Sequence, residues 1–148
     1  MRRTLCALLL LAALAGCGDD DGDGTSDPTP KAAEPELVQI VVITSAGGKV
    51  APRAYFVDDR QEMKDYVKTF ENRDDVVETV RQAVTDAGER EGRLAVATIA
   101  IGCDVPPDAS IVVTTDGPEV RPGKIVDPIP ECFAPATSIA LVEIPAAS

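Results

Sequence analysis

The sequence contains no histidine and no tryptophan, and aromatic residues make up only 3% of its 148 residues. Histidine is the side chain whose charge changes nearest to neutral pH, so its absence excludes Ser-His-Asp and Cys-His catalytic sites. With so few aromatic rings, the chain has no evident platform on which sugars or nucleic acid bases could stack. We therefore predict no catalytic residues and a protein that is not an enzyme.

Positive charge is also scarce, because 14 lysines and arginines face 25 aspartates and glutamates, for a formal net charge of −11. A strongly acidic chain without a basic patch repels phosphate backbones, so we expect no nucleic acid partner. The sequence also lacks a phosphate-binding loop and a dinucleotide-binding fingerprint. We accordingly expect no cofactor.

A metal site is not expected either. Asp19, Asp21, Asp23 and Gly24 copy the opening of an EF-hand calcium loop, but the twelfth position of that loop is Pro30 instead of glutamate. Zinc would need more sulfur or nitrogen ligands than a chain without histidine can offer. The acidic run is better interpreted as a solvated spacer.

The N-terminus begins with a basic pair, Arg2 and Arg3, followed by an apolar run from Leu5 to Leu14. This run has the length of the core of a signal peptide and is too short to span a bilayer. The run ends in Leu14-Ala15-Gly16-Cys17. These seventeen residues resemble the signal peptide and lipobox of bacterial lipoproteins.

The resemblance implies that residues 1–16 are a signal peptide that is removed and that Cys17 carries lipid. The protein would then be anchored in the cell membrane or the outer membrane and face away from the cytoplasm. Each buried methylene contributes about 0.8 kcal/mol, so two or three acyl chains form a firm anchor. The membrane, reached through the lipid on Cys17, is the first expected partner.

Residues 17–36 are expected to form the lipidated cysteine and a disordered acidic tether. The stretch from Gly18 to Glu36 is rich in acidic residues, contains three prolines and shows no apolar periodicity. Such a segment cannot bury enough apolar surface to offset the entropy cost of ordering it. The remaining residues, 37–148, suffice for one modest hydrophobic core and are predicted to form a single domain.

Two cysteines, Cys103 and Cys132, lie in that domain. In an oxidising envelope compartment such a pair most often forms a disulfide. In the chain-entropy model this link would contribute roughly 3.5 kcal/mol. A catalytic redox pair would need neighbouring cysteines, which these are not.

The domain begins with a predicted strand, Leu37 to Thr44, which is β-branched and nearly all apolar. Gly47-Gly48 gives the freedom of a turn, and residues 50–57 are predicted to return as the second strand of a hairpin. Pro52 cannot donate a hydrogen bond to a sheet, so that second strand is expected at an edge.

Two helices are predicted next. The first should begin at a cap formed by Asp58 or Asp59, with Gln61 or Glu62 completing a capping box. Both helices carry apolar stripes at helical spacing, which we interpret as core. The stripes are Met63, Tyr66, Val67 and Phe70 in the first helix, and Val76, Val77, Val80, Val84 and Ala87 in the second. Asp74 and Asp75 suit the first turn of the second helix, and Gly88 should end it.

Further strands are predicted at residues 94–103, 111–115 and 138–144. A proline-rich loop, residues 117–135, is predicted between the last two of them. Strands and helices are segregated along the chain, which is typical of an α+β fold. We predict a mostly antiparallel sheet with a pair of helices packed on one face, and one disulfide.

The sequence leaves function open between two classes, and no ligand-binding residue can be named from it. The preferred hypothesis is a non-enzymatic binding or accessory module of the cell envelope, whose partner is an envelope protein or a small-molecule ligand. The alternative is a peptidase inhibitor or regulator that acts through the loop 117–135, because prolines reduce the entropy lost on binding. The same loop could instead be an irregular edge segment without a binding role.

Overall fold

The computed structural model describes residues 33–129 and 133–146. They belong to the second of two units, which are divided between Lys31 and Ala32. The element order is β1 (Glu36–Thr44), β2 (Tyr55–Phe56), α1 (Arg60–Val67), α2 (Arg73–Ala87), β3 (Arg93–Gly102), β4 (Ala109–Thr114), β5 (Gly117–Pro122) and β6 (Ala136–Ile144). All strand pairs are antiparallel, in a four-stranded sheet with the order β1-β6-β3-β2 and a two-stranded sheet of β4 and β5. The predicted α+β fold with a mostly antiparallel sheet is confirmed.

Strand β6 lies in the middle of the larger sheet, between β1 and β3. Its register places Ala140 opposite Ile40 of β1 and opposite Ala97 of β3. Residues 137–142 of this strand are all buried, because both faces of the sheet are covered. An uninterrupted run of apolar and small residues is what such a position favours.

The predicted hairpin between residues 37–44 and 50–57 is wrong. β2 is only two residues long, and it pairs with β3 at the far edge of the sheet instead of with β1. Ser45, Gly47 and Gly48 all have positive φ angles and lead the chain away from β1. β1 pairs along one side with β6 in eight residue pairs, and this pairing buries far more apolar surface than a short hairpin could. Pro52 does precede an edge strand, as expected.

Helix α1 begins at a side-chain cap, because the Asp59 carboxylate accepts hydrogen bonds from the backbone N–H groups of Gln61 and Glu62 at 2.8 and 3.0 Å. The capping box is not formed. The Glu62 carboxylate instead accepts from the backbone N–H of Phe56 at 2.7 Å, while the Asp59 N–H donates to the Phe56 carbonyl. This arrangement ties the start of the helix directly to β2.

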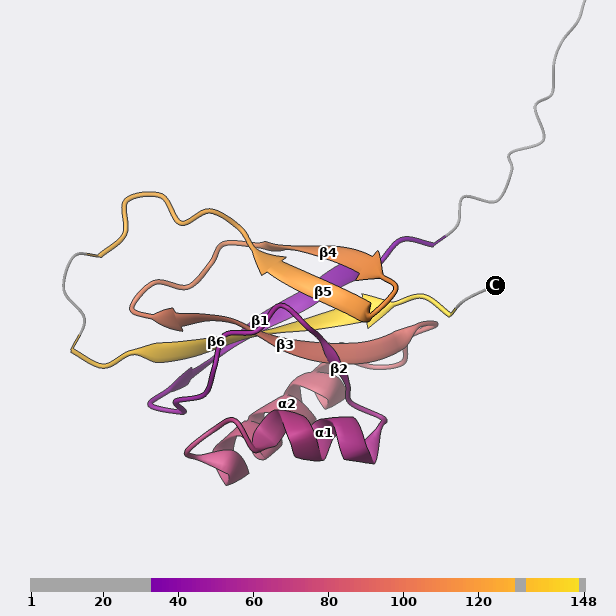
Figure 1. Cartoon of the computed structure of the whole chain (residues 1–148), viewed down its shortest axis with the longest axis horizontal. Coiled ribbons are helices and arrows are strands. Elements are labelled where there is room, and N and C mark those ends of the chain that lie inside the picture. The colour runs from indigo at the N-terminus through magenta and orange to yellow at the C-terminus, as the bar shows by residue number, and fades with distance from the viewer. Residues whose placement is uncertain (1–32, 130–132, 147–148) are drawn as a thin grey trace, which may run out of the picture. The chain divides into compact units, whose positions relative to one another are not determined.

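Figure 1 shows the two helices on one side of the larger sheet and the β4–β5 hairpin on the other. On the helix side, the buried cluster joins Tyr66, Phe70, Val76, Val80 and Ala83 of the helical segment with Ile43, Ala46, Val96, Ile139 and Leu141. The Gln39 amide also donates to the Ala83 carbonyl at 3.0 Å, which links β1 to α2. On the hairpin side, the cluster is Ala54, Ala95, Ala97, Ile99, Val120, Ala140, Val142 and Ile144.

The predicted loop 117–135 is wrong in its first third, because residues 117–122 form β5. Pro118 and Pro122 are tolerated because the outer edge of β5 pairs with the chain only through the short bridge at Arg53 and Glu119, among the described residues. Pro118 is buried, and its carbonyl accepts a hydrogen bond from the Ala54 N–H at 2.9 Å. The prolines of residues 117–122 thus suggested a loop where the chain forms a strand.

Candidate functional site

Several residues singled out from the sequence fall outside the described part of the chain. Cys17 and Cys132 lie outside it, as do residues 1–16 and most of the predicted tether. Cys103 follows β3 directly, and its sulfur is not a free thiol. The pairing of Cys103 with Cys132 therefore stays a prediction.

The two carboxylates at the start of α1, Asp58 and Asp59, have structural roles. Asp58 pairs with Arg93, whose Nε and Nη2 donate to its two oxygens at 3.0 and 2.7 Å. The hydrogen bonds from Arg93 lower the pKa of the Asp58 carboxyl. The same guanidinium lies 3.8 Å from the centroid of the Phe56 ring, so Asp58, Arg93 and β2 form one surface cluster. Asp59 caps α1, as described above.

The described remainder of the proline-rich segment, residues 123–129 and 133–135, exposes apolar side chains. Val126 is 74% exposed, Ile129 is 56% exposed and Phe133 is 97% exposed. The carboxylate of Asp104 accepts a hydrogen bond from the Ile129 N–H, which ties the segment to the turn after β3. Exposed apolar side chains on a tied segment are typical of an interaction surface.

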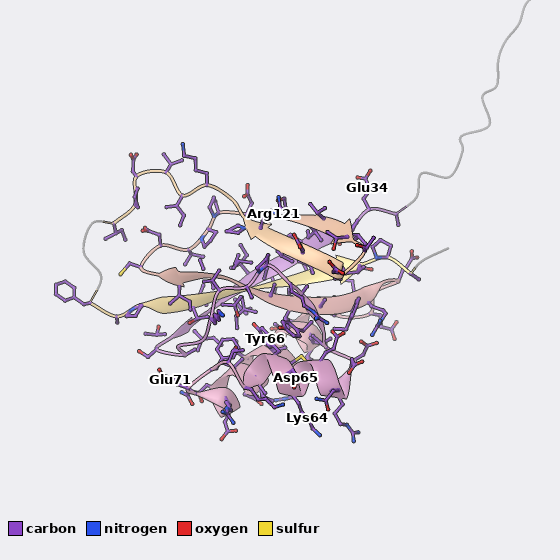
Figure 2. All side chains as sticks on the ribbon, viewed as in Figure 1. Glu34, Lys64, Asp65, Tyr66, Glu71 and Arg121 are labelled. Carbon is purple, nitrogen blue, oxygen red and sulfur yellow. The ribbon has the colours of Figure 1, made fainter. Side chains whose placement is uncertain are left out.

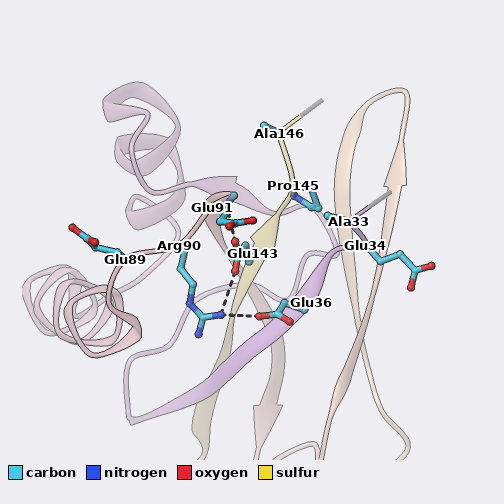
Figure 3. A pocket seen from close by; sticks show the side chains of 10 residues that line it. Ala33, Glu34, Glu36, Glu89, Arg90, Glu91, Glu143, Pro145 and Ala146 are labelled. Atoms are coloured by element: carbon cyan, nitrogen blue, oxygen red, sulfur yellow. Dashed lines mark hydrogen bonds and ion pairs between the residues drawn. The ribbon is translucent and has the colours of Figure 1, made fainter. Parts of the chain in front are cut away.

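A cavity of about 520 Å³ lies where both ends of the described chain meet, and it is strongly acidic. Figure 3 shows Arg90 reaching toward Glu36 and Glu143, while Glu34 and Glu89 point outward. The Arg90 Nη1 lies 2.7 Å from the Glu36 carboxylate and 3.2 Å from that of Glu143. The Glu143 carboxylate also accepts from the Gly92 N–H at 2.7 Å. Because its cation is already paired within the protein, we interpret this cavity as a structural ion cluster.

A different surface lies between the two helices, which we call the helix groove. It has a volume of about 390 Å³. Its lining is Val57, Met63, Val67, Val77, Val80 and Val84, with Arg60, Lys64 and Arg81 at the rim. Val77 is 45% exposed although it belongs to the apolar stripe of α2. The groove thus leaves apolar surface of both helices open to solvent.

The rim of the helix groove is basic in a chain whose net charge is −11. Arg60 and Lys64 stand one turn apart on α1, and within residues 33–129 and 133–146 neither side chain makes an ion pair. Figure 2 shows Lys64 on the side of α1 away from the sheet, with Tyr66 between α1 and the sheet. Arg81 pairs with Glu78 at 2.5 Å. Two unpaired cations therefore flank the apolar lining.

The helix groove was not predicted from the sequence, because both apolar stripes were interpreted entirely as core. The stripes are wider than the sheet can cover, so Val77 and Met63 fall between the helices. A usable signal was present in α1, where Arg60 and Lys64 alternate with Met63 and Val67 at helical spacing. Apolar and basic pairs one turn apart indicate a face that borders solvent.

Comparison of the chain with family models, with curated proteins and with solved structures found no match. Among the described residues, no helix has the length and apolar character needed to cross a membrane. The same residues contain no group of three or more acidic or cysteine side chains arranged to hold a metal ion.

Proposed function

We propose that this chain is a membrane-anchored lipoprotein of the cell envelope whose domain is a non-enzymatic binding module. The anchor is the lipid on Cys17, and the tether is the acidic segment between Cys17 and β1, which begins at Glu36. The helix groove is the observation that carries the binding role, because it leaves apolar surface of two helices unpartnered beside unpaired cations.

The occupant that fits the helix groove is an amphipathic segment of another envelope protein that presents apolar side chains flanked by carboxylates. Two helices side by side offer an elongated apolar depression, which suits a segment with apolar residues at helical spacing. The rim cations Arg60 and Lys64 attract a negatively charged occupant, although the chain as a whole is acidic. Apolar surface and complementary charge together would therefore favour docking of such a segment at this face.

Two finer features of the predicted fold belong to the same proposal. We propose that α1 and α2 act as one layer on the sheet, which keeps the groove between them open to a partner. We also propose the disulfide between Cys103 and Cys132. Peptide mass mapping of the oxidised full chain should give one cross-linked peptide containing both cysteines, and two free thiols would contradict the pairing.

The anchor is tested by mass spectrometry of the mature protein made in its own host. We expect Cys17 as the first residue, with the mass of two or three acyl chains added. Replacement of Cys17 by serine should move the protein from the membrane fraction to the soluble fraction. A wild-type protein that retains residues 1–16 or carries a bare Cys17 would overturn the anchored function.

The helix groove is tested with a synthetic amphipathic peptide that carries a leucine stripe bordered by glutamates, and with a second peptide in which lysines replace the glutamates. We expect the acidic peptide to bind the full chain more tightly than the basic peptide. Val77→Asp should abolish binding because it places a charge on the apolar lining. Lys64→Glu should reverse the preference between the two peptides, because it reverses the charge at the rim.

Matched substitutions elsewhere control for non-specific effects. Val113 is exposed on the hairpin, and Lys124 is exposed in the segment after β5. Val113→Asp and Lys124→Glu make the same chemical changes outside the groove, so they should leave both affinities unchanged. If they weaken binding as much as Val77→Asp and Lys64→Glu do, the groove is not the docking surface.

A second candidate function, a peptidase inhibitor or regulator, is favoured by the exposed apolar side chains at Val126, Ile129 and Phe133. Inhibition by a loop requires a segment held in one shape with side chains that can enter a peptidase cleft. A panel of serine, cysteine, aspartic and metallo-peptidases tests this function. Inhibition that is lost on replacing Ile129 by glutamate would favour it over docking at the helix groove, and no inhibition would exclude it.

A further inference from the structure

We propose that the domain carries a second binding site, for the carboxylate of a small organic acid, in a cavity at the edge of the sheet. This cavity, which we call the tyrosine pocket, has a volume of about 250 Å³. Its lining is Lys49, Ala51, Arg53, Tyr55, Tyr66, Thr69 and Thr98. It is separate from the helix groove, so either site can fail its test without affecting the other.

The tyrosine pocket is assembled by one extended segment lying against β3. Lys49, Ala51, Arg53 and Tyr55 occupy alternate positions, and alternate side chains of an extended segment point to the same side. The Ala51 N–H donates to the Thr98 carbonyl at 3.1 Å, which fixes the segment against the strand. Both cations are therefore brought to one cavity by the backbone conformation.

Gly48 explains how Lys49 reaches this position. Its φ angle is +102°, and a Cβ built on it would lie 2.7 Å from the ring of Phe70. Only glycine allows the chain to pass this close to the ring. The backbone then enters the extended segment with Lys49 as its first residue.

The hydroxyl groups that line the tyrosine pocket are hydrogen-bonded within the protein. The Tyr66 hydroxyl and the Thr98 hydroxyl form a buried hydrogen bond of 3.1 Å, and the Thr69 hydroxyl donates to the Tyr66 carbonyl at 2.8 Å. The rings of Tyr55 and Tyr66 lie 5.3 Å apart, centroid to centroid. Burial raises the pKa of the Tyr66 hydroxyl, so it stays neutral and keeps its proton. Aromatic rings beside oriented hydroxyls suit a ligand with an apolar body.

The charge in the tyrosine pocket is incompletely neutralised. Within the described ranges 33–129 and 133–146, the Lys49 ammonium makes no hydrogen bond or ion pair. The Arg53 guanidinium lies over the Tyr55 ring, 5.3 Å from its centroid. Its ion pair with the Glu62 carboxylate is long, at 3.7 Å, and that carboxylate also accepts a hydrogen bond from the backbone N–H of Phe56. The nearby Asp65 is held by Lys68 at 2.6 Å.

The guanidinium of Arg53 and the ammonium of Lys49 can thus both turn toward a ligand in the pocket. A planar guanidinium matches the two oxygens of a carboxylate, and an ammonium beside it adds a second charge-assisted hydrogen bond. A phosphate would also be attracted, but the ring-lined floor favours an anion with an apolar body. These features assign the pocket to a small organic acid, whether free or at the end of a peptide.

Intrinsic fluorescence tests this assignment, because the chain has two tyrosines and no tryptophan, and both tyrosines line the pocket. We expect cyclohexanecarboxylate to change the fluorescence of the purified full chain in a saturable way. Cyclohexanecarboxamide has the same shape without the charge. Its affinity should be lower by a factor of roughly ten or more, because a charge-assisted hydrogen bond is lost. Equal binding of the acid and the amide, or no saturable change with the acid, would overturn the assignment.

Substitutions locate the bound acid. Lys49→Met and Arg53→Met should each weaken binding of cyclohexanecarboxylate roughly tenfold, for the same reason. Lys124→Met removes an exposed cation outside the pocket and should leave binding unchanged. Equal losses in all three variants would show an unspecific charge effect and overturn the site.

Two further ligands define what the pocket binds. If inorganic phosphate binds as tightly as cyclohexanecarboxylate, the pocket is a general anion site and the assignment to organic acids is wrong. A short peptide with a free C-terminal carboxylate, compared with its C-terminally amidated form, separates the two sources of the ligand. Tighter binding of cyclohexanecarboxylate than of this peptide assigns the pocket to small metabolites. Tighter binding of the peptide assigns it to chain ends.

Discussion

The two faces of the larger sheet are covered in different ways. On the helix side, the sheet contributes Val96, Ile139 and Leu141 to a cluster that contains two aromatic rings from the helical segment, Tyr66 and Phe70. On the hairpin side, three of the six residues that the central strands contribute are alanines; the six are Ala95, Ala97, Ala140, Ile99, Val142 and Ile144. The large side chains fill the space between the sheet and the helices, whereas the three alanines leave little room for added volume beneath the hairpin.

The difference shows how one strand can serve two environments. Adjacent residues of β6 point to opposite faces, so Leu141 belongs to the helix side and Ala140 to the hairpin side. The helix side should therefore be sensitive to loss of volume, and the hairpin side to gain of volume. Substitutions on the two faces of the sheet test this contrast.

Leu141→Ala should have the largest effect. Leu141 is fully buried, and its truncation leaves a cavity against the helices. We expect the free energy of unfolding to fall by about 2–5 kcal/mol. Urea unfolding followed by circular dichroism measures the change. A loss below about 1 kcal/mol, the cost of a conservative core change, would show that the helices close over the gap and that their side is loosely packed.

Ala140→Leu should come second and act on the opposite face. The side chain added at this fully buried position must displace the hairpin or its own neighbours. We expect a loss of about 1–3 kcal/mol from overpacking. Ala87→Leu is the matched control, because Ala87 is only partly buried at the end of α2. Equal losses in the two variants would contradict the close approach of the hairpin.

Asp59→Ala removes the cap of α1 and leaves two backbone N–H groups of the first turn without their acceptor. We expect a loss of about 1 kcal/mol in the free energy of unfolding. Asp86→Ala is the control, since a carboxylate in the last turn of α2 gains nothing from the helix dipole. A stability of the Asp59 variant equal to that of the control would mean that solvent replaces the cap.

Asp58→Asn should have the smallest effect, and one that depends on pH. Hydrogen bonds from Arg93 hold the pKa of Asp58 below its ordinary value of 3.8, so the charged form is favoured in the folded state. The resulting stabilisation is fully present above the ordinary pKa and is lost as pH falls through the lower, folded-state pKa. Because both side chains are largely exposed, solvent screening keeps the effect small. Urea midpoints of the variant and the wild type should differ near about pH 6 and converge near about pH 2.

The sequence alone was sufficient to locate the helices and strands whose apolar residues follow a clear pattern. The stripe of Met63, Tyr66 and Val67 located α1, although Phe70, the last residue of the predicted stripe, lies beyond the end of the helix. Of the two candidate caps, Asp58 and Asp59, the second is the cap. The β-branched run of residues 37–44 and the final run of residues 138–144 located β1 and β6 within two residues. These patterns arise from local geometry, which a sequence records directly.

Two predictions were wrong, the hairpin after β1 and the full length of the loop 117–135. The first error concerns strand pairing and the second concerns proline content. Nothing local indicates that β1 pairs with β6, almost the whole domain away, instead of with the residues after Gly47-Gly48. The prolines at 118 and 122 suggested a loop, but a two-stranded sheet tolerates them at its edges. The helix groove was missed for a similar reason, since only the packed structure shows that Val77 is left uncovered.

The short segment formed by Pro52, Arg53 and Ala54 joins the two sheets. The Ala54 N–H donates to the Pro118 carbonyl, and the Val120 N–H donates to the Pro52 carbonyl at 2.7 Å. The hairpin therefore cannot move away from residues 52–54 without breaking both hydrogen bonds. In a hydrogen–deuterium exchange experiment, the amides of Ala54 and Val120 should exchange together as one opening unit. Since Arg53 sits between these two anchors, a ligand in the tyrosine pocket would slow that shared opening, and the hairpin would report occupancy of a site that it does not touch.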